Sequence, residues 1–307
     1  MGKVACVFPG QGAQAVGMCK DLYDHSDQAR QWFERADRTL GYSLSTLMFE
    51  GPEPELKLTY HAQPALLTAS IACWDAWTIL HSKPDYVVGH SLGEYSALVA
   101  SGVLSFEEAI LTVRARGELM DQAVPAGKGT MAAVLGADRT VLTELCRSIS
   151  QEIGVVELAN VNCPGQIVVS GSIEGIAAVV ERGKEAGAKR VIPLDVSGPF
   201  HSSLMKPASV GLAKVLAQLH MNPFQIPVIS NVTARPITAL HDIPLRLVEQ
   251  VYSPVLWEES IVWLIEQGVD TFVELGSGTV LSGLIKKINR DVRTISIGNV
   301  ASLTDNR

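Results

Sequence analysis

The chain has 307 residues, of which 47% are hydrophobic and 19% are charged. This composition provides enough apolar side chains for a large core and excludes a chain that is disordered throughout. The formal net charge of -7 argues against nucleic acid as the main ligand, because binding to a phosphate backbone depends on clustered basic residues.

Five cysteines are widely spread, with no CxxC pair and no Cys/His spacing that suits zinc. We therefore expect no metal site and a reducing, cytoplasmic compartment. The apolar run before Pro9 is too short for a signal-peptide core. The longest apolar stretch, residues 65–80, is interrupted by Asp75 and predicts a buried helix rather than a membrane span.

Short β-branched runs alternate with longer helical patterns, which is typical of a mainly parallel sheet covered by helices. The first strand is expected over residues 3–8 and another over 85–89, followed at once by a helical segment from Ser91. A capping box that begins at Ser105 predicts a helix over 106–123. Ser91 is therefore expected at a strand-to-helix junction.

Between residues 129 and 196 the pattern changes to a smaller, self-contained order. Strands and helices alternate there as β-α-β-β-α-β, the ferredoxin-like order, over 130–135, 139–153, 155–161, 166–170, 173–186 and 190–196. Gly- and Pro-rich joints flank the segment at 125–129 and 197–199, as expected where a small domain is inserted into a larger one.

Beyond the insert, a helix is expected over 204–219, with strands near 228–230, 271–275 and 293–297. We predict an α/β fold in which one large domain, residues 1–127 and 197–307, is interrupted by a ferredoxin-like insert, residues 128–196.

Residues 89–93 read Gly-His-Ser-Leu-Gly, a G-x-S-x-G sequence that makes Ser91 the candidate nucleophile. A serine on a sharp turn between strand and helix projects its hydroxyl outward, and the flanking glycines let the turn close. The amide of Leu92 then points toward an oxyanion that forms on the substrate. Because the motif also occurs by chance, a tight turn without a catalytic role is the alternative.

A serine nucleophile needs a base, and the chain has seven histidines. His90 is adjacent to Ser91, and adjacent side chains diverge at a tight turn. His201 lies in the Gly- and Pro-containing loop 197–203, where a rigid connection can place a catalytic group. The alternative for His201 is a polar residue that caps the next helix.

Residues 10–15 match the dinucleotide fingerprint G-x-G-x-x-A, which raises a nucleotide-binding module as another class of function. Such a site needs a helix directly after the glycines, whereas the next helix is expected over 28–40. We favour an oxyanion site in which Gln11 donates a hydrogen bond to the developing negative charge.

Arg116 lies on the helix expected over 106–123. Packed against the serine turn, it can hold a carboxylate by two parallel hydrogen bonds, and the alternative is a solvated surface charge. Polar residues in other turns are expected to satisfy backbone groups rather than contact substrate, namely Asn160, Asn162, Asn231 and Gln166.

Seven segments of the chain occur together, in this order: FPGQGAQ at 8–14, GHSLGE at 89–94, RG at 116–117, NVNCPGQIVVSG at 160–171, GPFH at 198–201, SNVT at 230–233 and ELGSG at 274–278. They resemble the acyltransferase family of fatty acid and polyketide synthesis, which includes the malonyl-CoA:acyl carrier protein transacylases. The resemblance implies an α/β-hydrolase-like large domain that carries a ferredoxin-like insert.

The resemblance also implies roles for individual residues. Ser91 is implied as the nucleophile that accepts the malonyl group, and His201 as its general base and later general acid. The backbone carbonyl of Gln250 is implied to orient this histidine, so that the site is a Ser-His dyad without an acid.

Four further residues are implied to bind the substrate or its transition state. Gln11 and the amide of Leu92 would form the oxyanion hole, and Arg116 would pair with the free carboxylate of malonate. Phe200 would favour malonyl over methylmalonyl through the bulk of its ring beside the α-carbon.

The implied reaction moves a malonyl group from malonyl-CoA to the phosphopantetheine thiol of acyl carrier protein by a ping-pong route. No bound cofactor is expected, because coenzyme A enters as a thioester substrate and phosphopantetheine belongs to the carrier. The carrier is typically acidic, so we expect it to dock at a local basic patch, with candidates Lys184, Lys189, Arg190, Lys286, Lys287 and Arg290. Neither nucleic acid nor a membrane is expected as a partner.

Two alternatives share these motifs. The first is a discrete malonyl acyltransferase that loads polyketide synthase carriers. The second is a serine thioesterase or esterase, which is disfavoured because Arg116, Gln11 and Phe200 together describe a malonyl pocket.

Overall fold

The larger part of the molecule is built on a parallel sheet with the strand order β10-β9-β1-β2-β7. A computed structural model describes residues 2–125 and 127–306. The strands of this sheet are β1 (Lys3–Phe8), β2 (Tyr86–Gly89), β7 (Val228–Ile229), β9 (Val269–Leu275) and β10 (Arg293–Ile297). Because β1 and β2 run parallel as neighbours, their carboxyl ends open at the same edge of the sheet.

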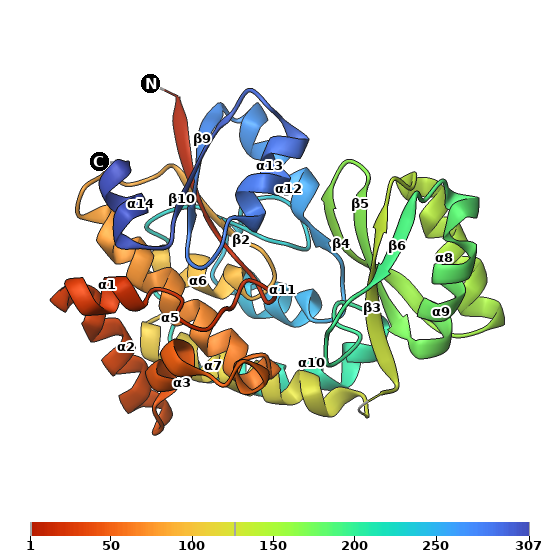
Figure 1. Cartoon of the computed structure of the whole chain (residues 1–307), viewed down its shortest axis with the longest axis horizontal. Helices are drawn as coiled ribbons and strands as arrows, with labels where there is room; N and C mark the ends of the chain where they lie inside the picture. Colours follow the sequence, from red (N-terminus) through yellow and green to blue (C-terminus); the bar gives the residue numbers. More distant parts are fainter. Residues whose placement is uncertain (1, 126, 307) are drawn as a thin grey trace.

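Helices cover both faces of this sheet (Figure 1). In chain order they are α1 (Lys20–His25), α2 (Asp27–Leu40), α3 (Leu44–Glu50), α4 (Glu53–Leu56), α5 (Thr59–Thr78), α6 (Gly93–Ala100), α7 (Phe106–Ala123), α10 (Lys206–Leu216), α11 (Asp242–Gln250), α12 (Trp257–Glu266), α13 (Val280–Ile288) and α14 (Val300–Asp305). The apolar stretch over 65–80 lies in the buried helix α5, as predicted. Among the described helices, none has both the length and the apolar character that crossing a membrane requires.

The insert forms a second sheet, with the order β6-β3-β5-β4-β8. It comprises β3 (Gly129–Leu135), α8 (Arg139–Glu152), β4 (Val156–Cys163), β5 (Gln166–Ser172), α9 (Ile173–Arg182), the 3-10 turn η1 (Gly183–Ala186) and β6 (Arg190–Pro193). The β-α-β-β-α-β order is therefore present as predicted. Helices α8 and α9 lie on the side of this sheet that faces away from the large domain (Figure 1).

A strand from outside the insert extends this second sheet. β8 (Val255–Leu256) belongs to the carboxyl-terminal part of the large domain and pairs in parallel with β4, Asn160 opposite Val255. The sequence analysis did not predict this strand. The division at residues 128 and 196 stays a prediction, and residue 126 of the expected joint lies outside the described residues.

Several predicted bounds are wrong, each for a local reason. The helix expected from Ser91 begins at Gly93, because Ser91 itself adopts the left-handed region with φ 52°. The strand expected to reach residue 196 ends at Pro193, because the chain turns soon after it: the Leu194 amide still donates to the Met131 carbonyl at 3.0 Å, but the Val196 amide donates back to the Leu194 carbonyl at 3.1 Å. The helix expected over 204–219 is a 3-10 turn, η2 (Ser203–Met205), followed by α10.

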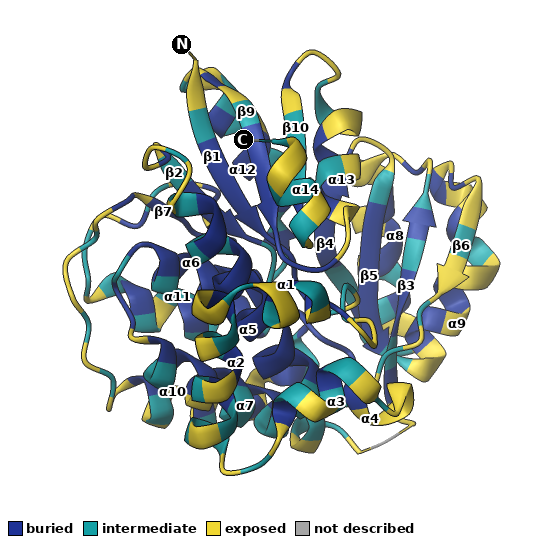
Figure 2. Cartoon of the chain, turned by 60° about the vertical axis from the view of Figure 1, so that its left-hand side comes forward, coloured by how far each residue is buried: buried dark blue, intermediate teal, exposed yellow. Residues whose placement is uncertain are grey.

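Buried side chains alternate between the two faces of β1, which explains its continuous apolar sequence. Cys6 and Phe8 join the core beneath α2, α5 and α7, whereas Ala5 and Val7 pack on the opposite side with α12 and α13. A separate apolar core lies within the insert, between its sheet and α8 and α9. Figure 2 shows buried residues concentrated in the central strands and in α5 and α6.

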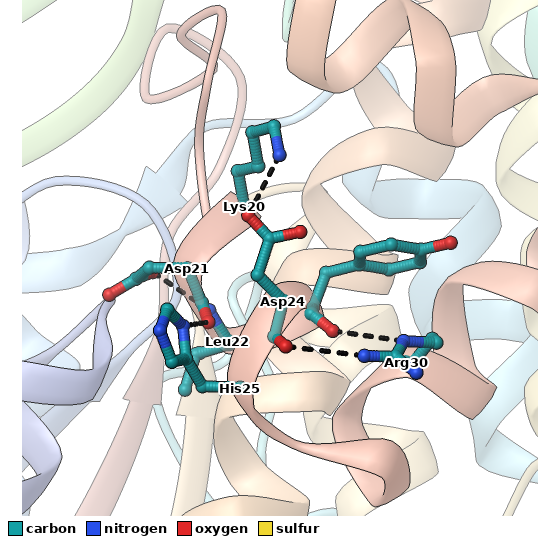
Figure 3. A network of polar contacts seen from close by, with 7 residues as sticks. Lys20, Asp21, Leu22, Asp24, His25 and Arg30 are labelled. Atoms are coloured by element: carbon teal, nitrogen blue, oxygen red, sulfur yellow. Dashed lines mark hydrogen bonds and ion pairs between the residues drawn. The ribbon is translucent and has the colours of Figure 1, made fainter.

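The turn between α1 and α2 is fixed by polar contacts (Figure 3). Arg30 donates to the backbone carbonyls of Tyr23 at 3.1 Å and Asp24 at 3.2 Å. Lys20 pairs with Asp24 at 2.7 Å. These contacts are largely exposed and are a structural feature of the amino-terminal helices.

Candidate active site

A cavity of about 570 Å³ lies where the carboxyl edge of the parallel sheet faces the insert. Five of the seven predicted site residues line it, namely Gln11, Ser91, Arg116, Phe200 and His201. The other two, Leu92 and Gln250, are fully buried. Leu92 follows Ser91 directly in the chain, and the Gln250 side chain bonds the Ser91 carbonyl and Arg116. The structure thus brings together residues from five separate segments of the chain.

Ser91 occupies a strained turn between β2 and α6. Its φ of 52° lies in the left-handed region, which is uncommon for a residue with a side chain. A Cβ added to Gly89 would lie 1.8 Å from the carbonyl carbon of Gly93, and one added to Gly93 would lie 2.1 Å from the Phe8 oxygen. Only glycine fits at these two positions, so the glycines of the motif are required by packing.

Asn231 holds this turn from the loop after β7. Its Oδ1 accepts from the amide of Ser91 at 2.7 Å, and its Nδ2 donates to the carbonyl of Gly89 at 2.6 Å. Asn231 therefore satisfies backbone groups, as predicted. Asn162, on β4, contacts a side chain instead of a backbone group: its Oδ1 accepts from Nε2 of His90 at 2.9 Å.

His201 lies beside the serine rather than beside the next helix. Its Nε2 is 2.7 Å from Ser91 Oγ, and its Nδ1 is 2.8 Å from the backbone carbonyl of Gln250. Because a carbonyl oxygen can only accept, Nδ1 carries the proton and Nε2 is left free to accept from the serine hydroxyl. His201 also has a left-handed backbone, with φ 60°.

The protonation state of His201 suits a base. Burial, together with the nearby positive charge of Arg116, lowers the pKa of His201 to about 3. The imidazole is therefore neutral at pH 7 and can take a proton from Ser91. His90 points away from the serine hydroxyl toward Asn162, and the structure does not place it as the base.

Arg116 is buried, with 1% of its surface exposed, and is not a solvated helix charge. Its Nη1 donates to Gln63 Oε1 at 2.8 Å, and its Nη2 donates to Gln250 Oε1 at 3.0 Å and to Ser91 Oγ at 3.2 Å. All three acceptors are neutral, and Nε has no acceptor among the described residues. Burial lowers the pKa of Arg116, so the site holds a desolvated cation that lacks a directly bound anion.

Two main-chain amides, one in the serine turn and one in the loop against it, have no acceptor among the described residues. In the described part of the chain, neither the amide of Gln11 nor that of Leu92 donates a hydrogen bond. The Gln11 loop lies directly against the turn, since a Cβ on Gly10 would lie 2.4 Å from the carbonyl of His90. Amides in this arrangement can stabilise an oxyanion. No helix begins within residues 10–15, because α1 begins at Lys20, which argues against a nucleotide site there.

Three polar groups of the site were missed by the sequence analysis. They are the Gln63 side chain, the Gln250 side chain and the carboxylate of Glu94, all fully buried. Gln63 lies in α5, two residues before the apolar stretch that begins at residue 65. A polar residue beside a stretch expected to be buried was the available signal. Glu94 follows the serine motif in the first turn of α6, where its position alone does not show burial.

Comparisons with known proteins agree with this geometry. Residues 5–303 match the family model described as acyl transferase domain. The malonyl CoA-acyl carrier protein transacylase of Bacillus subtilis (strain 168) is 54% identical over 299 residues, which cover 97% of this chain and 94% of the relative.

Solved structures give the same result. An acyl carrier protein S-malonyltransferase from Vibrio cholerae O1 biovar eltor superposes with a TM-score of 0.96 at 45% identity, covering 99% of this chain and 100% of the other. A malonyl-transacylase in complex with its type II polyketide synthase acyl-carrier protein superposes with a TM-score of 0.96 at 42% identity, covering 99% and 100%. The chain belongs to the acyl transferase family.

Proposed function

We propose that this protein transfers a malonyl group from malonyl-CoA to the phosphopantetheine thiol of an acyl carrier protein, in fatty acid biosynthesis. One observation carries the proposal: Ser91 Oγ lies 2.7 Å from a neutral histidine and 3.2 Å from a buried arginine. A nucleophile, its base and a cation for a carboxylate therefore meet at one atom. The names of the similar proteins support the same reaction.

The first half-reaction forms the malonyl-enzyme. Ser91 Oγ attacks the thioester carbon as its proton moves to His201 Nε2, and the carbonyl oxygen takes up negative charge near the amides of Gln11 and Leu92. The C–S bond then breaks, and coenzyme A leaves as a thiol after taking the proton from His201. The Gln250 carbonyl keeps the proton on Nδ1 throughout, as a carboxylate does in a triad.

The second half-reaction is the same chemistry in reverse order. The carrier thiol gives its proton to His201 Nε2 and attacks the ester carbon of malonyl-Ser91. When the C–O bond breaks, Ser91 takes the proton back and the malonyl thioester of the carrier leaves. Because both substrates are thioesters of the same arm, one cavity serves both steps. We expect no bound cofactor for either step.

Arg116 selects the acyl group. The malonate carboxylate forms two parallel hydrogen bonds with the guanidinium and supplies the anion that its neutral partners lack. An acetyl group leaves the buried cation without that anion, which costs free energy. Phe200 directly precedes His201 in the chain, is buried and lines the cavity. Its ring limits the substituents that the α-carbon of the acyl group can carry.

We place the carrier at the basic residues of the insert. Lys184, Lys189 and Arg190 are exposed, and none has an ion-pair partner within the described residues. Lys286 and Lys287 also have no ion pair within the described residues, but their ammonium groups already donate to protein oxygens, Lys286 to the carbonyls of Arg290 and Val292 and Lys287 to Gln166 Oε1. The insert patch therefore has its positive charge available to an acidic carrier.

The experiment that tests the function is intact-protein mass spectrometry after brief exposure to malonyl-CoA without carrier. We expect a malonyl adduct on the native chain that is absent from Ser91→Ala and does not form with acetyl-CoA. Adding holo carrier should then remove the adduct and charge the carrier. Free malonate that accumulates without carrier would instead indicate a hydrolase and would overturn the proposal.

A further inference from the structure

A buried carboxylate that the proposed mechanism does not use lies directly behind the site. Glu94 is fully buried in the first turn of α6, and its amide donates to the carbonyl of Ser91 at 3.0 Å. Its Oε2 accepts from Gln250 Nε2 at 2.7 Å and from the Asn231 amide at 3.1 Å. Its Oε1 has no partner among the described residues.

The Gln250 amide has its orientation set by three acceptors, of which Glu94 is the nearest. Gln250 Nε2 donates to Glu94 Oε2 at 2.7 Å, to the Ser91 carbonyl at 3.0 Å and to Asn231 Oδ1 at 3.3 Å, so its Oε1 is turned toward Arg116 Nη2 at 3.0 Å. With the amide reversed, NH₂ would face the guanidinium and a donor would oppose a donor. Glu94 therefore provides the shortest, and the only ionisable, of the three contacts that make Gln250 an acceptor on the Arg116 side.

We propose that Glu94 is a positioning residue for acyl-group selection: it orients the Gln250 amide, which in turn holds Arg116 against the malonate carboxylate. This inference rests on the proposed function and deepens it. Glu94 does not contact the substrate; it acts through Gln250.

The arrangement does not depend on the charge of Glu94. Burial raises the pKa of its carboxyl to about 7, although the hydrogen bonds from Asn231 and Gln250 and the charge of Arg116 oppose this shift. When the group is protonated, the proton can reside on Oε1, the oxygen without a partner. Oε2 then still accepts from Gln250, so both forms of the carboxyl keep Arg116 in place.

The test compares Glu94→Ala, Glu94→Gln and Glu94→Asp with the native enzyme. The quantity measured is the ratio of kcat/KM for malonyl-CoA to kcat/KM for acetyl-CoA, with holo carrier as acceptor. Ser96→Ala is the matched control, because Ser96 is equally buried on the same helix and its Oγ has no partner among the described residues. Circular dichroism and thermal unfolding show which variants are folded.

We expect Glu94→Ala to lower the ratio about tenfold or more, the effect of losing a hydrogen bond that serves a charged group. Glu94→Gln keeps an acceptor oxygen and should retain the ratio within about threefold of the native value. Should the alanine variant not fold, Glu94→Asp, which withdraws the acceptor by one methylene, should lower the ratio by an intermediate amount.

A folded Glu94→Ala or Glu94→Asp whose two kcat/KM values fall together would show a merely structural role and would overturn the inference. Glu94→Gln that loses selectivity as the alanine variant does would also overturn it, because the negative charge would then be what matters. Native enzyme that forms no malonyl-Ser91 would instead contradict the proposed function, whatever the Glu94 variants do.

Discussion

The two sheets of this protein contribute to the cavity in different ways. The parallel sheet and its helices provide every group that we assign to bond making, including Ser91 after β2 and Arg116 on α7. The antiparallel sheet of the insert provides wall residues, Met131 and Asn160, and the exposed basic residues near β6. In the proposed reaction, chemistry and carrier recognition are therefore assigned to separate parts of the fold.

The same division appears in the backbone. Ser91 and His201, the two residues that exchange a proton in the proposed reaction, both adopt left-handed conformations in the large domain. In the insert, the left-handed positions among the described residues are glycines, which adopt this region without strain. Strain at the large-domain site is held by neighbouring packing and hydrogen bonds. Changes to the large-domain site should therefore affect acyl transfer itself, and changes to the exposed basic residues of the insert should affect only the carrier.

The largest expected effect comes from the nucleophile. Ser91→Ala should lower malonyl transfer by about 10³-fold or more, because no acyl-enzyme can form. Stopped-flow measurement of coenzyme A release gives the rate. Residual transfer within tenfold of the native rate would mean that another group accepts the malonyl group. The assignment of the nucleophile to the parallel-sheet domain would then be wrong.

The next effect tests the geometry of the buried cation. Arg116→Lys keeps a positive charge but loses the planar fork, so we expect kcat/KM for malonyl-CoA to fall about 100-fold. Activity with acetyl-CoA should change much less. If kcat/KM falls equally for malonyl-CoA and acetyl-CoA, Arg116 stabilises the fold and does not select the acyl group.

A smaller effect is expected from the insert. The double charge reversal Lys189→Glu with Arg190→Glu should raise KM for the carrier about tenfold and leave acylation by malonyl-CoA unchanged. The difference should shrink at high salt, since exposed charges are screened. Lys286→Glu, on α13, is the control at the other candidate patch. Unaltered carrier kinetics in the insert variant would remove that patch as the dock.

The smallest expected effect is that of lowering the pH on His201, the proposed general base. Burial lowers the pKa of His201 to about 3, so protonation, which disables a base, begins only as the pH approaches that value. The rate of malonyl-Ser91 formation should not fall between pH 8 and pH 5 because of this group. An acidic limb centred near pH 6.5 in rapid-quench data would show that His201 titrates as an exposed histidine does.

Part of this site could be predicted from sequence because its signals are local. The glycines around Ser91 are close together in the chain, and the order of elements in the insert follows from short periodic runs. The network around Arg116 could not be predicted in this way. It joins Gln63 on α5 and Gln250 on α11 to α7, across 53 and 134 residues of sequence, and only tertiary packing brings those side chains together.

The two-residue strand β8 was hidden for a related reason, since a run this short has no periodicity to detect. Its pairing with β4 has a consequence for protein engineering. An insert produced on its own as residues 128–196 would lack this fifth strand and would expose the edge of β4. Unpaired strand edges promote association between chains. In a chimera between relatives, β4 would pair with the recipient's β8, so taking residues 255–256 from the same donor as the insert would keep the native pairing.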